Sequence, residues 1–269
     1  MGVGDRRRVA VLVDRHAVPV HRLPATVRWF SAGGDDYARY RPTYPVALVD
    51  ALASAAPDTR RAVDVGCGTG QLTALLAERF TGVVGLDPAG EQIAHAVTAG
   101  NIDYRVCAAE HLAVEDHTAD LVTAAQAAHW FDLSAFYGEV RRIAVDDAVL
   151  ALITYGVLVL DDDLADRFGT FYREEIGPYW PSERRHVDNG YAELEFPFER
   201  LDTPAVTIER SWTLEEFVGY LGTWSAVRRA GEADAGGLVD ALAADLAPRW
   251  GDDRRVVRWP VTVIAGRVR

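Results

Sequence analysis

The chain has 269 residues, 49% of them hydrophobic and 25% charged, a composition typical of one large folded domain or a domain with an insert. Its formal charge of -12 disfavours nucleic acids and membrane surfaces as partners, because phosphate groups repel an acidic protein. All 28 basic residues are arginine, which excludes mechanisms that use a P-loop lysine or a Schiff-base lysine. The 2 cysteines, Cys67 and Cys107, are too few for a disulfide framework or a four-ligand zinc site, so no metal is expected.

The same composition predicts where the protein works. Its apolar runs fall far short of the about 18 residues that a membrane-spanning helix needs. With so few cysteines, this predicts a cytoplasmic protein. Residues 1–26 show no hydrophobic period and contain Pro19 and Pro24, so we expect an N-terminal extension without regular structure.

From residue 60 onward, short apolar runs alternate with segments of helical period, the pattern of parallel β-α-β units. Apolar residues at positions 72, 75, 76 and 80, and again at 133, 136, 140 and 143, predict crossover helices. The predicted strands cover residues 62–65, 83–86, 104–107, 121–125 and 148–154. We therefore expect an α/β fold with a Rossmann-like, doubly wound sheet.

The alternation stops after Tyr155. Residues 161–200 are rich in aromatic and charged side chains and are too many for a plain connection, so we expect a cap inserted after the fifth strand. A strand at 205–208, helices at 214–224 and 238–246, and a strand at 256–265 follow. These elements would make residues 201–269 the completion of a seven-stranded sheet that begins in residues 27–160.

A glycine-rich turn joins the first predicted strand to its helix in the string AVDVGCGTGQLTALLAERF, residues 62–80. Gly66, Gly68 and Gly70 allow a tight turn and a close approach to a ligand, and the helix offers free N–H groups at its start. The dinucleotide fingerprint requires a further glycine where this chain has Gln71, so a nicotinamide cofactor is disfavoured.

Two carboxylates accompany this turn. Asp87 closes the second predicted strand, where a carboxylate can accept hydrogen bonds from both hydroxyls of a ribose. Asp64 lies in the first strand, two residues before Gly66, and is placed to receive a cationic amino group. A nucleoside that carries an amino acid satisfies both, and S-adenosyl-L-methionine is that ligand.

Four strings together resemble the class I S-adenosylmethionine-dependent methyltransferases with a type 11 domain, over about residues 28–269. They are VDVGCGTG at 63–70, VVGLDP at 83–88, AAEHL at 108–112 and DLVTAAQAAHWF at 120–131. The strings WFSAGGDDYARYRPTYP at 29–45 and QAAHWF are similar to the branch of trans-aconitate methyltransferases. Where family members usually carry Pro-Gly-Gly before the fifth strand, this chain has Val145, Asp146 and Asp147.

The resemblance implies a set of cofactor-binding residues in the core of residues 27–160. Gly66, Cys67 and Gly68 would line the methionine moiety, and Asp87 would hold the ribose with Pro88 beside it. We interpret Cys67 as a small buried residue and not as a reactive thiol, because no cationic residue nearby in the sequence would lower its pKa. The other implied positions are Tyr37, Tyr40, Arg41, Asp64, Gln92, Ala109, Glu110 and Gln126.

Several of these positions have a specific expected role. Arg41, beside two tyrosines, would bind the cofactor carboxylate, although that segment could also be a surface helix. Glu110 with the backbone of Ala109 would meet the adenine edge, unless it is an ordinary solvated acid. Gln126 would lie where the fourth strand opens toward the sulfonium.

The acceptor side is less clear from the residues. His129 follows the fourth strand and could act as a general base or could orient the substrate. Candidates for the acceptor pocket are His129, Trp130, Trp180, Tyr191 and Trp224, and any of these aromatic residues could belong to the core instead. Arg184, Arg185 and His186 form a short cationic cluster that could attract a polyacid or could be a solvated face.

The predicted function is therefore methyl transfer from S-adenosyl-L-methionine to a small molecule, which releases S-adenosyl-L-homocysteine. The family branch favours a carboxylate oxygen as the acceptor, and such an acid needs no base because it is ionised near neutral pH. A natural-product tailoring enzyme that methylates oxygen, nitrogen or carbon is the alternative. A binding protein without catalysis is a third possibility, and the residues leave the oligomeric state open.

Overall fold

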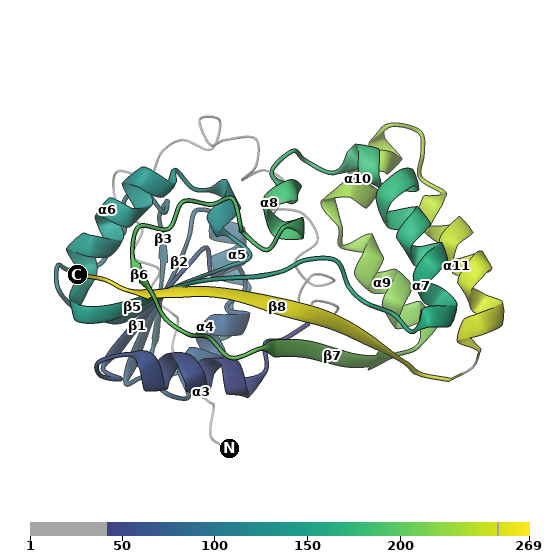
Figure 1. Ribbon diagram of the computed structural model, residues 1–269. Helices are drawn as coiled ribbons and strands as arrows, with labels where there is room; N and C mark the ends of the chain where they lie inside the picture. The colour runs from purple at the N-terminus through teal and green to yellow at the C-terminus, as the bar shows by residue number, and fades with distance from the viewer. Residues whose placement is uncertain (1–41, 252) are drawn as a thin grey trace, which may run out of the picture.

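The computed structural model describes residues 42–251 and 253–269 (Figure 1). The predicted N-terminal extension, residues 1–26, lies outside the described residues. The same holds for the implied cofactor ligands Tyr37, Tyr40 and Arg41. These predictions therefore stay predictions.

The centre of the molecule is a mixed sheet with the strand order β3-β2-β1-β4-β5-β8-β6. Its parallel strands are β1 (Arg61–Val65), β2 (Gly82–Asp87), β3 (Ile102–Val106), β4 (Ala119–Ala125) and β5 (Ala144–Tyr155). The long strand β8 (Arg255–Arg267) runs antiparallel to β5. Because the chain winds outward in both directions from the neighbouring strands β1 and β4, the predicted doubly wound sheet is confirmed.

In the described part of the chain, the sheet has eight strands, one more than the seven that the sequence predicted. Strand β7 (Val206–Trp212) pairs antiparallel with the first half of β8, and the short strand β6 (Glu199–Arg200) pairs with its other end. Figure 1 shows β7 and β8 as a ribbon that continues away from the parallel strands. Strand β5 begins at Ala144, and its pairing with β8 begins at Val149. Between these residues, Asp147 adopts a φ of 60°. Aspartate tolerates this left-handed conformation better than most residues do.

Helices cover both faces of the parallel strands because successive residues of a strand point to opposite sides. Ala62 packs into one hydrophobic core and its neighbour Val63 packs into the other. The covering helices are α3 (Val46–Ala55), α4 (Gln71–Leu76), α5 (Gly90–Ala94) and α6 (Leu133–Ile143). Helix α6 begins after Asp132, whose carboxylate accepts a hydrogen bond of 3.2 Å from the backbone N–H of Ala135.

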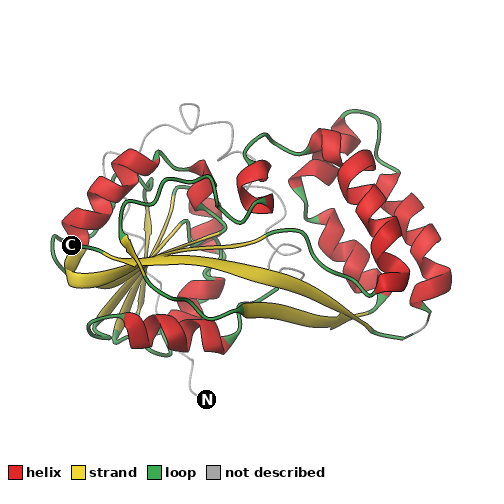
Figure 2. Ribbon diagram, in the orientation of Figure 1, coloured by secondary structure: helices red, strands yellow, loops and turns green. Residues whose placement is uncertain are grey.

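A second group of helices lies beside the sheet, at the far end of the β7–β8 ribbon (Figure 2). It consists of α7 (Asp162–Thr170), α9 (Leu214–Gly222), α10 (Ser225–Glu232) and α11 (Leu238–Trp250). Phe168 of α7 packs against Phe217 and Trp224, so the helix from the predicted cap segment is joined to helices that follow β7. Among the described helices, none is long and apolar enough to cross a membrane.

The rest of the predicted cap segment returns to the sheet. After the π-helix η3 (Phe171–Glu175) and the 3-10 helix η4 (Gly177–Tyr179), the short helix α8 (Arg184–Asp188) contacts β5 and the 3-10 helix η2 (Ala128–Trp130). In Figure 1, α8 lies between the sheet with its covering helices and the second helical group. Residues 161–200 thus contribute to both parts of the molecule.

Candidate functional site

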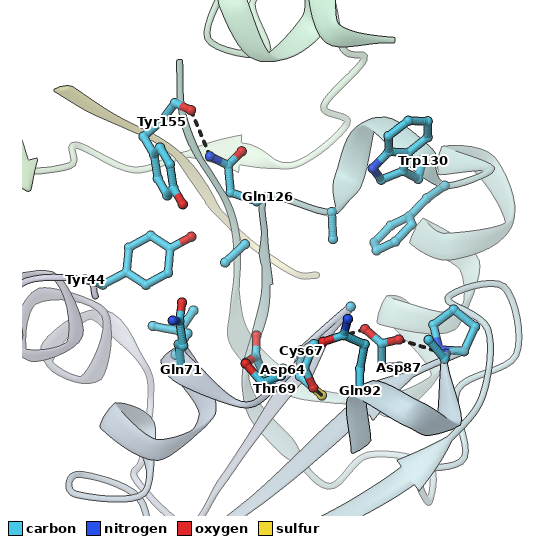
Figure 3. Close-up of a pocket in the computed structure, with 18 residues that line it drawn as sticks. Tyr44, Asp64, Cys67, Thr69, Gln71, Asp87, Gln92, Gln126, Trp130 and Tyr155 are labelled. Carbon is cyan, nitrogen blue, oxygen red and sulfur yellow. Dashed lines mark hydrogen bonds between the residues drawn. The ribbon is translucent and has the colours of Figure 1, made fainter. Parts of the chain in front are cut away.

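A cavity of about 970 Å³, its open mouth included, lies at the carboxyl ends of the parallel strands (Figure 3). The cavity is lined by these predicted residues: Asp64, Gly66, Cys67, Gly68, Asp87, Pro88, Gln92, Gln126 and Trp130. The structure therefore brings together predicted residues from three separate stretches of the chain, 64–68, 87–92 and 126–130.

The glycine turn after β1 forms the floor of the cavity. Gly66 and Gly70 have φ values of 70° and 79°, a region that strongly favours glycine. A side chain at Gly66 would collide with the Cβ of Ala127, and one at Gly70 would collide with the hydroxyl of Tyr104. The turn is tied to β2 because the carbonyl of Leu86 accepts hydrogen bonds from the backbone of Gly66 at 2.7 Å and from the next residue at 3.0 Å.

Asp87 lies at the end of β2 and faces the cavity (Figure 3). One carboxylate oxygen accepts a hydrogen bond of 2.9 Å from the backbone of Gly68, and the other accepts one of 2.8 Å from the backbone of Ala89. Burial raises the pKa of Asp87, and the two backbone donors act against this by stabilising the ionised form. Because each carboxylate oxygen can accept more than one hydrogen bond, Asp87 still has capacity for two ribose hydroxyls.

Asp64 lies deeper, with 1% of its surface exposed, yet it contributes to the cavity wall. Its two oxygens accept hydrogen bonds from the hydroxyls of Thr73 at 2.7 Å and Thr123 at 2.8 Å. Burial raises the pKa of Asp64 to about 6, and the nearby charge of Asp87 adds to this effect. Among the described residues that line the cavity there is no arginine, so two acidic groups face a space that suits a cationic ligand.

Gln126 forms the edge of the cavity where β4 ends, with a φ of 55°. Its amide nitrogen donates to the backbone carbonyl of Tyr155 at 2.8 Å, and its amide oxygen accepts from the hydroxyl of Thr154 at 2.9 Å. The side chain is therefore held against the end of β5. In Figure 3, Tyr44 and Tyr155 lie on one side of the cavity and Trp130 lies on the opposite side.

Ala109 and Glu110, expected at the adenine edge, do not line this cavity. Ala109 is buried, and the carboxylate of Glu110 accepts a hydrogen bond of 2.9 Å from the backbone of Asp132. Glu110 thus helps to hold the start of α6. Its contact with the adenine stays a prediction.

Of the five residues expected in the acceptor pocket, Trp130 is the one that lines the cavity. His129 lies behind it, with Nδ1 2.9 Å from the hydroxyl of the buried Tyr191. Burial, aided by the positive charges of Arg184 and His186, lowers the pKa of His129 to about 3, so the imidazole is neutral at pH 7.

The remaining two acceptor candidates lie farther away. Trp180 and Trp224 contact each other, with ring centroids 5.2 Å apart. Trp224 also packs against Phe168 of α7, within the second helical group. Their role in acceptor binding stays a prediction.

The structure adds cavity residues that the sequence analysis did not predict. Two of them had a usable signal, because Gln71 follows the glycine turn directly and Tyr155 closes a strand at the edge where ligands bind. Tyr44 lies in the string quoted at 29–45, but that string implied Tyr37, Tyr40 and Arg41 as ligands and gave no reason to select Tyr44. The residues that were missed are Tyr44, Thr69, Gln71, Leu72, Ala89, Ala125, Ala127, Phe131 and Tyr155.

Comparison with known proteins identifies the family. Residues 63–152 match the family model of a methyltransferase domain. A Dictyostelium discoideum protein named as a methyltransferase is 32% identical over 247 residues, which cover 88% of this chain and 94% of the relative. A Saccharomyces cerevisiae protein named as an S-adenosylmethionine-dependent methyltransferase is 30% identical and covers 70% of this chain and 77% of its own length.

A solved structure agrees with these relatives. It is that of a type II methyltransferase, so named, from Anaeromyxobacter dehalogenans. It superimposes with a TM-score of 0.80 at 39% identity, over 85% of this chain and 98% of the other. The chain therefore belongs to the class I S-adenosylmethionine-dependent methyltransferases.

The site fits the cofactor of this family. A glycine turn with no room for side chains at Gly66 and Gly70 lets the backbone approach a ligand closely. Asp64 and Asp87 both line the cavity, where they would suit the cationic amino group and the ribose of S-adenosylmethionine. The prediction of this cofactor is confirmed, whereas the resemblance to the trans-aconitate branch stays a prediction.

Proposed function

We propose that this enzyme transfers a methyl group to a carboxylate oxygen of a small-molecule acceptor and forms a methyl ester. The observation that carries the proposal is the state of His129. This residue follows β4 beside the cavity, and it is neutral, hydrogen-bonded to Tyr191 and outside the cavity lining. Its pKa of about 3 makes it a poor base at neutral pH.

The titratable residues described in the cavity lining also favour an acceptor that needs no base, because none of them is suited to remove a proton from it. The pKa of Cys67 is raised well above its usual value by burial, so its thiol stays protonated. Among the described residues that line the cavity, Asp64 and Asp87 are the two carboxylates, and both would serve the cofactor. A phenol or an alkylammonium group, with a pKa of about 10, would have to lose a proton, whereas a carboxylic acid with a pKa of about 4 is already ionised.

The residues of the chain would then work by binding and positioning. Asp87 would hold the ribose hydroxyls, Asp64 would pair with the amino group, and the turn from Gly66 to Gly68 would pack against the methionine part. S-adenosylmethionine, when bound, supplies an electrophilic methyl carbon bonded to a positively charged sulfur. Placing two reactants in a reactive arrangement can lower a barrier by about 7 to 11 kcal/mol, so no further acid or base is needed.

The aromatic walls complete the arrangement. Trp130 and Phe131 line one part of the cavity, and Tyr44 and Tyr155 line another. Their rings would exclude water from the reacting groups and would leave the acceptor oxygen poorly solvated and reactive. The cavity would thus accommodate a small molecule.

The test is incubation with methyl-labelled S-adenosylmethionine and a panel of small carboxylic acids, phenols and amines, followed by mild base. Label released as methanol identifies a methyl ester and supports the proposal. A base-stable labelled product would contradict it and would point to a tailoring enzyme that methylates phenolic oxygen, nitrogen or carbon. Tight cofactor binding without turnover on any acceptor would instead indicate a binding protein.

A further inference from the structure

Arg184, the first residue of α8, is a largely buried cation between the sheet and the second helical group. Its side chain is 19% exposed, whereas the next residue, Arg185, is exposed. The cationic cluster seen in the sequence is therefore not a uniform solvated face. One of its arginines points into the protein, where an unsatisfied charge is costly.

The guanidinium of Arg184 is held in one orientation by its neighbours. Its Nε donates hydrogen bonds to the hydroxyl of Tyr172 at 3.0 Å and to the carboxylate of Asp188 at 2.9 Å. The hydroxyl of Tyr172 donates in turn to the same carboxylate at 2.7 Å. The guanidinium carbon also lies 4.5 Å from the ring centroid of Trp180, a cation-π distance.

These contacts leave one edge of the guanidinium available. Among the described residues, none accepts a hydrogen bond from Nη1 or Nη2 of Arg184. The indole Nε1 of Trp180, under the same guanidinium, is a buried donor that also has no acceptor in the described part of the chain. The Nη1–Nη2 edge is a planar fork that matches the two oxygens of a carboxylate or two oxygens of a phosphate.

Arg184 lies next to the methyl-transfer site without lining it. Helix α8 contacts η2, the turn that carries His129 and Trp130. The rings of His129 and Trp130 are 4.8 Å apart, and Trp130 lines the cavity. The positive charge of Arg184 reaches His129, since after burial it is the largest cause of the lowered pKa there.

We propose that Arg184 is a specificity-determining residue that binds an anionic group of the acceptor through its Nη1–Nη2 edge. This inference rests on the proposed methyl transfer to a small molecule and names a residue for recognition of that molecule. The bound group is a carboxylate or a phosphate other than the group that receives the methyl. Tyr172, Asp188 and Trp180 are positioning residues for the guanidinium, because they hold its plane before the acceptor binds.

Two arguments indicate that the anionic group bound by Arg184 and the group that receives the methyl are separate parts of the acceptor. The methylated group must reach the cavity that Trp130 lines, and Arg184 is outside that lining. In addition, a guanidinium that donated two hydrogen bonds to the reacting oxygens would withdraw electron density from the nucleophile. The geometry therefore predicts an acceptor with two polar ends, one methylated and one held by Arg184.

The test uses the full chain loaded with S-adenosylhomocysteine and titration calorimetry, so that binding is measured without turnover. The probes are straight-chain dicarboxylic acids, phosphonocarboxylic acids and monocarboxylic acids of matched length. We expect the wild type to bind at least one doubly charged probe about tenfold or more tightly than its matched monoacid, equal to about 1.4 kcal/mol. Tighter binding of the dicarboxylic acids would indicate a carboxylate site at Arg184, and tighter binding of the phosphonocarboxylic acids would indicate a phosphate site.

Three variants make the test specific. Arg184→Gln should abolish the preference for the doubly charged probe, and Arg184→Lys, which keeps the charge but lacks the fork, should retain a small part of it. Arg185→Gln removes the same charge from the exposed neighbour and should keep the full preference. The affinity of each variant for S-adenosylhomocysteine shows whether that variant is folded. If Arg184→Gln does not fold, the comparison of the wild type with Arg184→Lys tests the proposal.

The two proposals fail separately. No preference in the wild type, or the same preference in Arg184→Gln, would overturn the role of Arg184 even if a methyl ester is formed. An Arg184-dependent preference together with a base-stable methylated product would support the role of Arg184 and overturn the ester. A loss of preference in Arg185→Gln equal to that in Arg184→Gln would show a diffuse charge effect and would also overturn the inference.

Discussion

Nδ1 of His129 lies 2.9 Å from the hydroxyl oxygen of Tyr191, and this pair holds a neutral imidazole directly behind the cavity wall. Tyr191 is buried and has a raised pKa because of that burial, so it stays protonated. Both partners are uncharged at neutral pH. The pair is therefore suited to fix the position of η2 and Trp130 rather than to take up a proton.

His129→Gln tests this role directly. If His129 only positions its neighbours, the variant should lose less than about tenfold in kcat/KM on a carboxylic acid, because glutamine can still hydrogen-bond to Tyr191. With S-adenosylmethionine saturating, so that the pH dependence of cofactor binding does not contribute, the pH profile of kcat in the wild type should show no inflection near the usual histidine pKa of about 6.5. Loss of activity on a phenol but not on a carboxylic acid would instead show that His129 acts as a base.

Asp87→Ala should weaken cofactor binding by about tenfold or more, or about 1.4 kcal/mol, because the ribose would lose its acceptors. Titration calorimetry with S-adenosylhomocysteine measures this. Asp202→Ala, which removes the same charge from an exposed position, is the matched control and should leave the affinity unchanged. An equal affinity in wild type and Asp87→Ala would show that Asp87 does not hold the ribose.

Asp64 predicts how cofactor binding depends on pH. Its pKa is about 6 in the free protein, and a bound amino cation would lower it, so affinity should rise with pH up to about 6 and then level off. Asp64→Asn should remove this dependence and bind more weakly at pH 7. A pH-independent affinity in the wild type between pH 5 and pH 7 would contradict the assignment.

The same residue affects the stability of the protein without cofactor. The pKa of Asp64 is raised from 3.8 to about 6 by folding, so the folded protein binds more protons in that interval. The contribution of Asp64 to the free energy of unfolding should therefore fall as pH rises from 3.8 to about 6. Denaturation at pH 7 should show that Asp64→Asn is as stable as the wild type or more stable, and a large loss of stability would contradict this.

Gly66→Ala should disrupt the turn. The new Cβ would collide with that of Ala127, and the positive φ adds strain of about 1 to 2 kcal/mol. We expect lower stability in chemical denaturation and a loss of cofactor affinity of about tenfold or more. Gly100→Ala is the control, because nothing lies within 4 Å of a Cβ there, and its stability should change by less than about 0.5 kcal/mol.

Local residue patterns were enough to predict the sheet, its crossover helices and the part of the cavity wall that the glycine turn and Asp87 form. Neighbours within a few residues along the chain determine three features: a short apolar strand, a turn that requires glycine at Gly66 and Gly70, and a carboxylate at Asp87. Parallel strands bring their carboxyl ends to one edge of the sheet, whichever segments come later in the chain. The strings at 63–70, 83–88 and 120–131 therefore contribute residues to one cavity, whereas Ala109 and Glu110 of the string at 108–112 do not line it.

The acceptor side depended on contacts between distant segments, and the tertiary structure alone decided it. Tyr44 and Tyr155 line the cavity, whereas Tyr191 is fully buried and does not. The sequence could not distinguish them, because an aromatic ring is equally favourable in a core and in a cavity wall. Arg184 and Arg185 are neighbours with the same chemistry, yet one is held inside by Tyr172 and Trp180 and the other faces water. Their roles differ because long-range packing determines which side of a helix faces the interior.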